Sequence, residues 1–324
     1  MKITLLISVL AIPVFYLTLA SLLALIPVKR KPAVDSLDFG VLTGMSENVT
    51  ASEHNYKARS GDELFYRLIP GRKDIFFILL HGSGSEGRYL LDPAQKLSIA
   101  TGINVVIPDL RGHGRSALGA LGDVRYLGQY EDDLEDLKQH LGKEHPGSSI
   151  ILGGHSSGGG LALKYGGGDH SAFDGYLLLA PYLGYRAPTA RPNSGGWVQV
   201  STRRYAGLAM LNNVGIKALN HLPVLFFNRP KEWNDPLQAE SYSYRLNESF
   251  STQSYEDNLR RNKRPILVLV GAEDEAFYAD KFEAVFRKNA PQALVKIIPG
   301  AKHLNLPNSE AAINNIGSWL NSTY

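Results

Sequence analysis

Short, uninterrupted apolar runs recur along the chain, and segments with helical periodicity lie between them. The apolar runs cover residues 75–80, 104–108, 149–153, 175–180, 265–270 and 293–298. The helical segments cover residues 89–101, 128–142, 157–166, 278–289 and 308–321. A strand buried on both faces has a continuous apolar run, and strands that alternate with helices build a mostly parallel sheet. The pattern therefore predicts a doubly wound α/β fold.

Two further strands are predicted ahead of this alternation. Residues 55–59 and 63–69 have strand-like patterns and are joined by the turn Ser60-Gly61-Asp62, which is typical of a hairpin. Such a hairpin adds antiparallel strands at one edge of an otherwise parallel sheet. With the six apolar runs, it predicts an eight-stranded sheet.

The N-terminus carries an apolar segment of a different kind, because no charged residue occurs in the 26 positions from Ile3 to Val28. A helix of that length would be about 39 Å long, enough to span a hydrocarbon layer of about 30 Å with some tilt. A cleaved signal peptide would have a shorter apolar region and a small-residue cleavage site, which Thr18-Leu19-Ala20 matches poorly. We therefore predict an uncleaved single-pass anchor over residues 1–28, with residues 3–28 in the membrane.

The flanking charges bear on the orientation of this anchor. Lys29-Arg30-Lys31 follows it, whereas only Lys2 and the α-amino group precede it. Because the cytoplasmic flanks of membrane helices carry the excess of Lys and Arg, a cytoplasmic location is favoured for the residues that follow the anchor, and the small margin leaves an extracytoplasmic location open. Residues 29–51 show no clear periodicity, so we expect a linker there.

Composition excludes several classes of function. The net charge is only +3 and no basic cluster recurs along the predicted fold, which argues against nucleic-acid binding. The chain has no cysteine, so disulfides, thiolate metal sites and a cysteine nucleophile are excluded. Neither a histidine pair with metal-ligand spacing nor a nucleotide-binding glycine fingerprint occurs, so no metal and no cofactor are predicted.

A candidate nucleophile stands where a predicted strand meets a predicted helix. The sequence Gly154-His155-Ser156-Ser157-Gly158 follows the apolar run 149–153 and opens a glycine-rich helical segment. A strand, a G-x-S-x-G turn and a helix in this order place a serine on a sharp turn with its hydroxyl exposed. The pattern therefore predicts Ser156 as a nucleophile that a neighbouring base activates.

Three other motifs stand at strand ends in a matching order. The first is His81-Gly82-Ser83-Gly84, the second is Glu273-Asp274-Glu275, and the third is His303. A serine, an acid and a histidine in this chain order are typical of the α/β-hydrolase triad. The pattern predicts His303 as the base, and the backbone N–H groups of Ser83 and Ser157 as the oxyanion hole.

These motifs together resemble a known family. With the stretch Pro108-Asp109-Leu110-Arg111-Gly112-His113-Gly114-Arg115-Ser116, the chain is similar to α/β-hydrolases of the monoacylglycerol-lipase-like and serine aminopeptidase S33-like branch. The resemblance implies an α/β-hydrolase core over residues 52–186 and 263–324, with a cap inserted over residues 187–262. It also selects Asp274 among three adjacent carboxylates, because the family places its acid third after the glycine.

The inserted segment is rich in aromatic residues and contains a helical stretch over residues 201–221. A cap in this position covers the active site, so its aromatic residues are candidates for substrate contact. The candidates are Trp197, Phe226, Phe227 and Trp233, together with His81 from the core. The alternative is that the cap aromatics fill the cap's own core and that His81 positions the oxyanion loop.

The sequence thus predicts a serine hydrolase that cleaves carboxylic esters, lipid esters such as monoacylglycerols included, through an acyl-enzyme on Ser156. The same triad would serve a thioesterase, an acyltransferase or an aminopeptidase. A non-catalytic binding protein with this fold is a further alternative, although the intact Ser, Asp and His argue against it. Neither the natural substrate nor the oligomeric state follows from the sequence.

Overall fold

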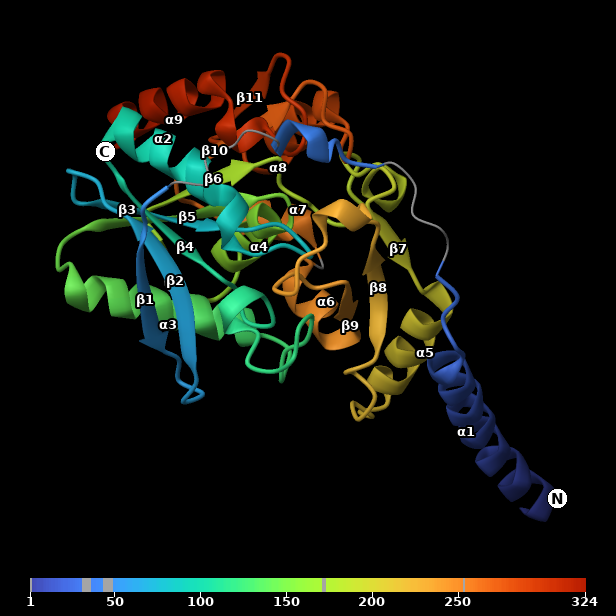
Figure 1. Cartoon of the computed structure of the whole chain (residues 1–324). Helices are drawn as coiled ribbons and strands as arrows, with labels where there is room; N and C mark the ends of the chain where they lie inside the picture. The colour runs from blue at the N-terminus through green and yellow to red at the C-terminus, as the bar shows by residue number, and fades with distance from the viewer. Residues whose placement is uncertain (1, 31–35, 43–48, 171–172, 253) are drawn as a thin grey trace.

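An eight-stranded sheet forms the centre of the computed structural model, which describes residues 2–30, 36–42, 49–170, 173–252 and 254–324, with side chains from residue 12 onward (Figure 1). The strand order is β1-β2-β4-β3-β5-β6-β10-β11. The strands are β1 (Ser52–Lys57), β2 (Glu63–Ile69), β3 (Ile75–Leu80), β4 (Asn104–Pro108), β5 (Ser149–His155), β6 (Gly175–Leu179), β10 (Ile266–Gly271) and β11 (Leu294–Ile298). Strand β2 is antiparallel to β1 and β4, and the other neighbours are parallel. The predicted eight-stranded, mostly parallel sheet is confirmed.

Helices cover the sheet. They are α2 (Leu91–Thr101), α3 (Gln129–Glu144), α4 (Ser157–Gly166), α8 (Phe282–Asn289) and α9 (Glu310–Thr323), and α7 (Tyr255–Arg261) packs against α4 and α8. In α3, the residues Tyr130, Leu134, Leu137 and Leu141 are buried at the three- and four-residue spacing of one helix face. Figure 1 shows α2 and α9 on one side of the sheet and α3 on the other.

The segment from β7 to α6, which we call the cap, has a small sheet of its own. Its strands are β7 (Val198–Val200), β8 (Pro223–Phe227) and β9 (Ser241–Ser243), and its helices are α5 (Thr202–Asn213) and α6 (Tyr244–Phe250). The helix expected over residues 201–221 is shorter, because Gly215 takes a positive φ of 82° just after α5 ends. The cap strands pair antiparallel across separations of up to 29 residues, which no local pattern indicates.

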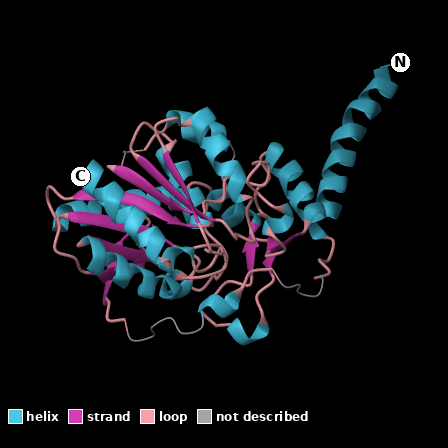
Figure 2. Ribbon diagram, turned by 90° about the horizontal axis from the view of Figure 1, so that it is seen from above, coloured by secondary structure: helices cyan, strands magenta, loops and turns pink. Residues whose placement is uncertain are grey.

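The N-terminal apolar segment forms helix α1 (Lys2–Leu25). Its N-terminal end projects away from the rest of the molecule, and its C-terminal turns lie on α5 of the cap (Figures 1 and 2). Ala20 and Ala24 are fully buried there, and a Cβ on Gly207 would lie 2.5 Å from the Ala24 backbone nitrogen. Arg204 donates to the carbonyl oxygens of Ala24 and Ile26, so the end of α1 is fastened to the cap.

In the part of the chain for which side chains are described, no helix combines the length and apolarity needed to cross a membrane. The structure therefore gives no support for the transmembrane anchor predicted for residues 3–28, of which residues 3–11 lie outside the part with described side chains. The C-terminal turns of α1 contribute Ala20 and Ala24 to a small cluster with Leu208, Leu211 and Val224.

Candidate active site

Ser156 occupies a strained turn between β5 and α4. Its backbone has φ 57° and ψ −121°, a left-handed conformation that non-glycine residues adopt at a cost. The turn needs glycine on both sides, because a Cβ on Gly154 would lie 2.7 Å, and one on Gly158 2.5 Å, from the Leu80 carbonyl oxygen. The sequence Gly154–Gly158 therefore brings α4 close against β3 and holds the Ser156 hydroxyl beyond the sheet edge.

The structure brings Ser156, His303 and Asp274 into one hydrogen-bonded chain. Ser156 Oγ lies 3.0 Å from His303 Nε2, and His303 Nδ1 lies 2.8 Å from Asp274 Oδ2. The other Asp274 oxygen accepts from the backbone nitrogens of Ala276 and Phe277. The aspartate and histidine side chains are almost fully buried. Because a carboxylate only accepts hydrogen bonds at neutral pH, His303 Nδ1 carries the proton and Nε2 is free to accept one from Ser156.

The neighbouring carboxylates do not contact the imidazole. Glu275 Oε2 accepts instead from the His303 backbone nitrogen at 2.9 Å, and Glu273 is exposed. Among Glu273, Asp274 and Glu275, only Asp274 is therefore placed to orient the ring.

Two backbone N–H groups near Ser156 remain available. No hydrogen-bond acceptor is found for the N–H of Ser83 or of Ser157 among the described residues. Ser83 follows β3 in the loop His81–Gly84, and Ser157 is the first residue of α4. Both positions match the donors predicted for an oxyanion hole.

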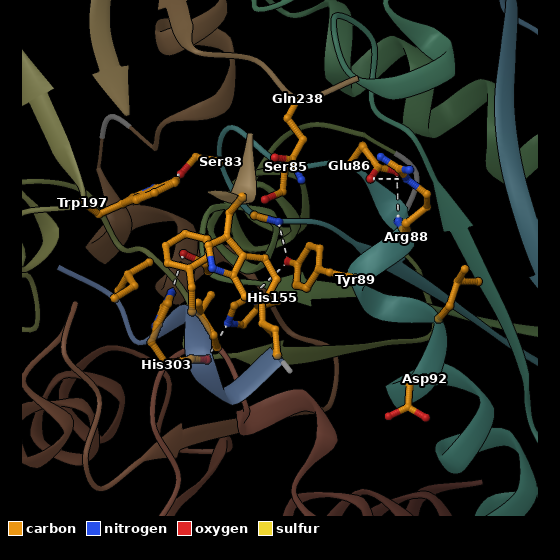
Figure 3. Close-up of a pocket in the computed structure, with 18 residues that line it drawn as sticks. Ser83, Ser85, Glu86, Arg88, Tyr89, Asp92, His155, Trp197, Gln238 and His303 are labelled. Carbon is orange, nitrogen blue, oxygen red and sulfur yellow. Dashed lines mark hydrogen bonds and ion pairs between the residues drawn. The ribbon is translucent and has the colours of Figure 1, made fainter. Parts of the chain in front are cut away.

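The N–H groups on either side of Ser83 are, by contrast, bound by tyrosine hydroxyls. Gly82 N–H donates to Tyr89 Oη at 2.9 Å (Figure 3). Gly84 N–H donates to Tyr242 Oη at 2.7 Å. The two tyrosine hydroxyls thus hold the loop through the N–H groups before and after Ser83. Among these three neighbouring N–H groups, only that of Ser83 is left without an acceptor among the described residues.

Each of the two tyrosine hydroxyls donates a hydrogen bond to a buried histidine. His155 Nε2 lies 3.0 Å from the His303 carbonyl oxygen and must donate to it, so His155 Nδ1 accepts from Tyr89 at 2.9 Å. His113 Nδ1 donates to the Arg111 carbonyl oxygen in the same way, so its Nε2 accepts from Tyr242 at 2.7 Å. Burial lowers the pKa of both histidines well below the usual value, which keeps both rings neutral and able to accept.

His81 is fully engaged with the backbone. Its Nδ1 donates to the Gly82 carbonyl oxygen at 2.9 Å, and its Nε2 accepts from the Leu110 N–H at 3.1 Å. It lines neither of the two cavities at Ser156. The structure thus places His81 as a support of the oxyanion loop, which was the alternative to a substrate contact.

The residues 108–116 that carried part of the family resemblance also support this loop. Asp109 Oδ1 accepts from Arg67 at 2.7 Å and from the Gly87 N–H at 2.9 Å, and its Oδ2 accepts from the Arg115 N–H. Asp109 is buried and therefore needs these partners. Through them it ties the end of β4 to the residues that follow the oxyanion loop.

Two cavities meet at Ser156 and His303. The larger has a volume of about 550 Å³ and the smaller about 50 Å³. The larger cavity is lined by the apolar residues Leu37, Phe39, Leu42, Leu91, Trp197, Trp233 and Leu304 and by the polar residues Ser85, Glu86, Arg88, Asp92 and Gln238. Figure 3 shows Trp197 and these polar residues around the cavity. The smaller lies under the cap, with Tyr182, Leu225, Phe250 and Phe277 in its wall.

The four cap aromatics proposed for substrate contact divide into two pairs. Trp197 and Trp233 line the larger cavity. Phe227 lies behind Trp197, with ring centroids 5.3 Å apart, and Phe226 faces the Arg30 guanidinium, so neither lines a cavity. The second pair is therefore not placed to contact a substrate in either cavity.

Sequence reasoning missed two groups of residues at this site. Tyr89 and Tyr242 were not singled out, because nothing in the sequence indicates that Tyr242 meets a loop 158 residues away. The cavity residues Leu37, Phe39 and Leu42 fall in the segment that was expected to be only a linker. An apolar cluster within an otherwise polar linker was the available signal.

The central sheet, the cap after β6 and the serine turn after β5 define an α/β-hydrolase. The sequence model of the family described as serine aminopeptidase, S33, matches residues 71–310, about three quarters of the chain. The chain belongs to this family, and the predicted resemblance is confirmed. The domain limits and the role of each site residue stay predictions.

Individual relatives agree with this family. A monoacylglycerol lipase of Mycolicibacterium smegmatis is 32% identical over 134 residues, which cover 41% of this chain and 47% of the relative. The human monoglyceride lipase is 25% identical over 44% of this chain and 45% of its own length. A proline iminopeptidase of Saccharolobus solfataricus is 34% identical over 39% of each chain. The matched stretch thus spans about half or less of these curated relatives.

Solved structures share the fold. A thermostable carboxyl esterase from Bacillus coagulans, solved with glycerol, aligns over 85% of this chain and 99% of its own with a TM-score of 0.63 and 18% identity. A monoacylglycerol lipase from Paleococcus ferrophilus aligns over 81% of this chain and 100% of its own with a TM-score of 0.57 and 19% identity. At these identities the likeness establishes the fold alone.

Proposed function

We propose that this protein hydrolyses carboxylic esters through an acyl-enzyme on Ser156. The observation that carries the proposal is the chain from Ser156 Oγ through His303 to Asp274, beside the two backbone donors of Ser83 and Ser157. A nucleophile, a base, a group that orients the base and an oxyanion site are the parts that acyl transfer requires.

In the proposed mechanism, His303 Nε2 takes the Ser156 proton as Oγ attacks the ester carbonyl carbon. The carbonyl oxygen becomes an oxyanion, which accepts from the Ser83 and Ser157 N–H groups. The imidazolium then protonates the departing alcohol and leaves the acyl group on Ser156. Water attacks the acyl-enzyme in the same way, and His303 returns the proton to Ser156. Asp274 stabilises the imidazolium in both halves of the reaction.

The larger cavity favours an amphipathic ester. Its apolar lining residues suit an aliphatic chain, and its polar lining residues suit a hydroxylated alcohol or headgroup. Lipid esters with a small polar alcohol, monoacylglycerols included, combine these two chemistries. The curated lipase relatives support the same substrate class.

The carboxylates of the cavity bear on the aminopeptidase alternative. An aminopeptidase needs an acidic group for the substrate's free ammonium, and Glu86 and Asp92 are the acidic residues in the cavity lining. Glu86 already pairs with Arg67 and Arg88, and Asp92 pairs with Lys96 at 2.9 Å. Because these charges are neutralised within the protein, the site favours a neutral ester over an amino-terminal peptide.

The proposal is tested by active-site labelling and an ester panel. A fluorophosphonate probe is expected to add once, at Ser156, as read by intact mass and peptide mapping. Ser156→Ala is expected to abolish labelling and to lower the turnover of p-nitrophenyl esters by about 10³-fold or more. Ser98→Ala on α2, which removes a buried hydroxyl that donates to the Pro70 carbonyl oxygen, serves as the control. Normal turnover by folded Ser156→Ala would refute the assignment, and preferential cleavage of aminoacyl amides would move the function to the aminopeptidase class.

A further inference from the structure

We propose that the N-terminal segment Leu37–Leu42 is a wall of the substrate site and selects the length of the aliphatic chain that binds beside Ser156. This inference rests on the proposed ester hydrolysis. It assigns a binding role to a part of the chain that lies outside both the hydrolase core and the cap insertion.

The segment contributes apolar side chains to the larger cavity. Leu37, Phe39 and Leu42 line it together with Ser156 and His303. The Phe39 ring stands between two cap tryptophans, with its centroid 5.7 Å from that of Trp197 and 5.7 Å from that of Trp233. Phe39 and the two tryptophans therefore form one aromatic surface in the cavity. The core and the cap alone supply only part of this surface.

An ion pair and a backbone contact fasten the segment to the triad loops. The Asp38 carboxylate lies 2.7 Å from Lys302 Nζ, and Lys302 directly precedes His303. The Asp38 N–H donates to Glu275 Oε1 at 3.4 Å, while Glu275 Oε2 accepts from the His303 N–H at 2.9 Å. The wall is thus positioned by the same two loops that carry the triad acid and base.

The chain that leads into the segment is held on the cap. Arg30 donates to the Phe227 carbonyl oxygen at 3.3 Å and pairs with Glu240, and Gln199 donates to the Lys29 carbonyl oxygen at 3.1 Å. The N-terminal region is therefore bound to the cap at residues 29–30 and to the catalytic loops at Asp38. It joins the two parts of the protein between which the substrate binds.

The chemistry of the wall defines the ligand it takes. Its exposed surface in the cavity is aliphatic and aromatic, so it recognises a saturated or unsaturated hydrocarbon chain and offers nothing to a charged group. Each methylene that such a wall buries raises kcat/KM by about fourfold, which corresponds to about 0.8 kcal/mol. Loss of the Phe39 ring should remove this gain for the carbons it covers and leave a shorter chain unaffected.

The test compares Phe39→Ala with the unmodified full-length protein on p-nitrophenyl esters from acetyl to dodecanoyl. We expect kcat/KM for decanoyl and dodecanoyl esters to fall about tenfold, and the value for the acetyl ester to change less than twofold. Asp38→Asn removes the charge that meets Lys302 while keeping an oxygen for the Gly40 N–H, so it should shift the profile in the same direction by a smaller factor. Ile99→Ala removes an exposed apolar side chain from α2 and serves as the control.

Two outcomes of the ester panel would overturn the inference. One is an unchanged chain-length profile in Phe39→Ala, and the other is an equal loss on every ester, which would indicate a general structural role. A binding assay separates this inference from the proposed function. Decanoate binding, followed by the fluorescence of Trp197 and Trp233, should weaken about tenfold in Phe39→Ala even if no ester is cleaved. Equal affinity of the two proteins for decanoate would refute the role of Leu37–Leu42 as a wall of the site. Failure of fluorophosphonate labelling would instead refute the proposed function.

Discussion

The hydroxyl of Tyr89 lies 2.9 Å from Nδ1 of His155. The same hydroxyl accepts the Gly82 N–H, and His155 donates to the His303 carbonyl oxygen. The oxyanion loop and the backbone of the triad histidine are therefore joined through one tyrosine and one neutral histidine. Because Tyr242 and His113 hold Gly84 from the other side, the intervening Ser83 N–H is kept free and fixed in direction.

Removing the Tyr89 hydroxyl should impair turnover more than binding. In Tyr89→Phe the Gly82 N–H loses its acceptor, so the loop can rotate and the Ser83 donor moves away from the oxyanion. Loss of a complete oxyanion donor costs about 10²- to 10³-fold in kcat, so we expect a decrease of about 10- to 100-fold with KM nearly unchanged. Steady-state kinetics on one ester provide the measurement.

Tyr56→Phe is the matched control, because it removes a buried hydroxyl that donates to the Asp133 carbonyl oxygen away from the site. A matching loss of kcat in Tyr56→Phe, or a rise of KM alone in Tyr89→Phe, would show that Tyr89 acts on general stability or on substrate binding. Tyr242→Phe should reproduce the kcat effect from the opposite side of Ser83.

The three adjacent carboxylates should differ sharply in their effect on activity. Asp274→Asn is expected to lower kcat by about 10⁴, because a neutral amide does not stabilise the imidazolium and can favour the wrong tautomer. Glu275→Gln keeps an oxygen that can accept from the His303 N–H, so its loss should stay within about tenfold. Glu273→Gln should have little effect. If Glu275→Gln gave the largest loss, the orienting acid would have to be reassigned.

The contact between α1 and α5 should depend on the absence of a side chain at Gly207. Gly207→Val introduces atoms where a Cβ alone would lie 2.5 Å from the Ala24 nitrogen and 2.6 Å from the Ala20 carbonyl oxygen. We expect α1 to separate from the cap and trypsin to cleave faster at Lys29 and Arg30. Ala206→Val, on the exposed face of the same helix, should leave the cleavage rate unchanged. Equal protection in both variants would show that α1 is held by other contacts.

Stability should fall in mildly acidic solution. Burial lowers the pKa of His113 and His155 in the folded protein, whereas an unfolded histidine has a pKa of about 6.5. Below that pH the unfolded chain binds more protons than the folded one, so the free energy of unfolding decreases by up to about 1.4 kcal/mol per pH unit for each histidine. Denaturant unfolding between pH 7.5 and 5.0 measures the slope, and His113→Gln should reduce it. An identical slope in the variant would contradict this linkage.

The sequence alone determined the sheet, the serine turn and the order of the triad motifs, because these depend on local patterns. A strand buried on both faces must be apolar throughout, and the turn at Ser156 requires Gly154 and Gly158. The charge-free N-terminus likewise predicted a helix, which α1 is, although the structure does not support its assignment to a membrane.

Only the tertiary structure decided which groups meet across long separations. The hold of Tyr242 on Gly84 and the place of Phe39 between two cap tryptophans both join segments far apart in the chain. No periodicity records such contacts, since each depends on how the cap and the N-terminal segment pack over the sheet edge. The chain order of the serine, acid and histidine motifs can therefore be predicted from the sequence. The shape of the substrate cavity follows from how the core, the cap and the N-terminal segment pack together.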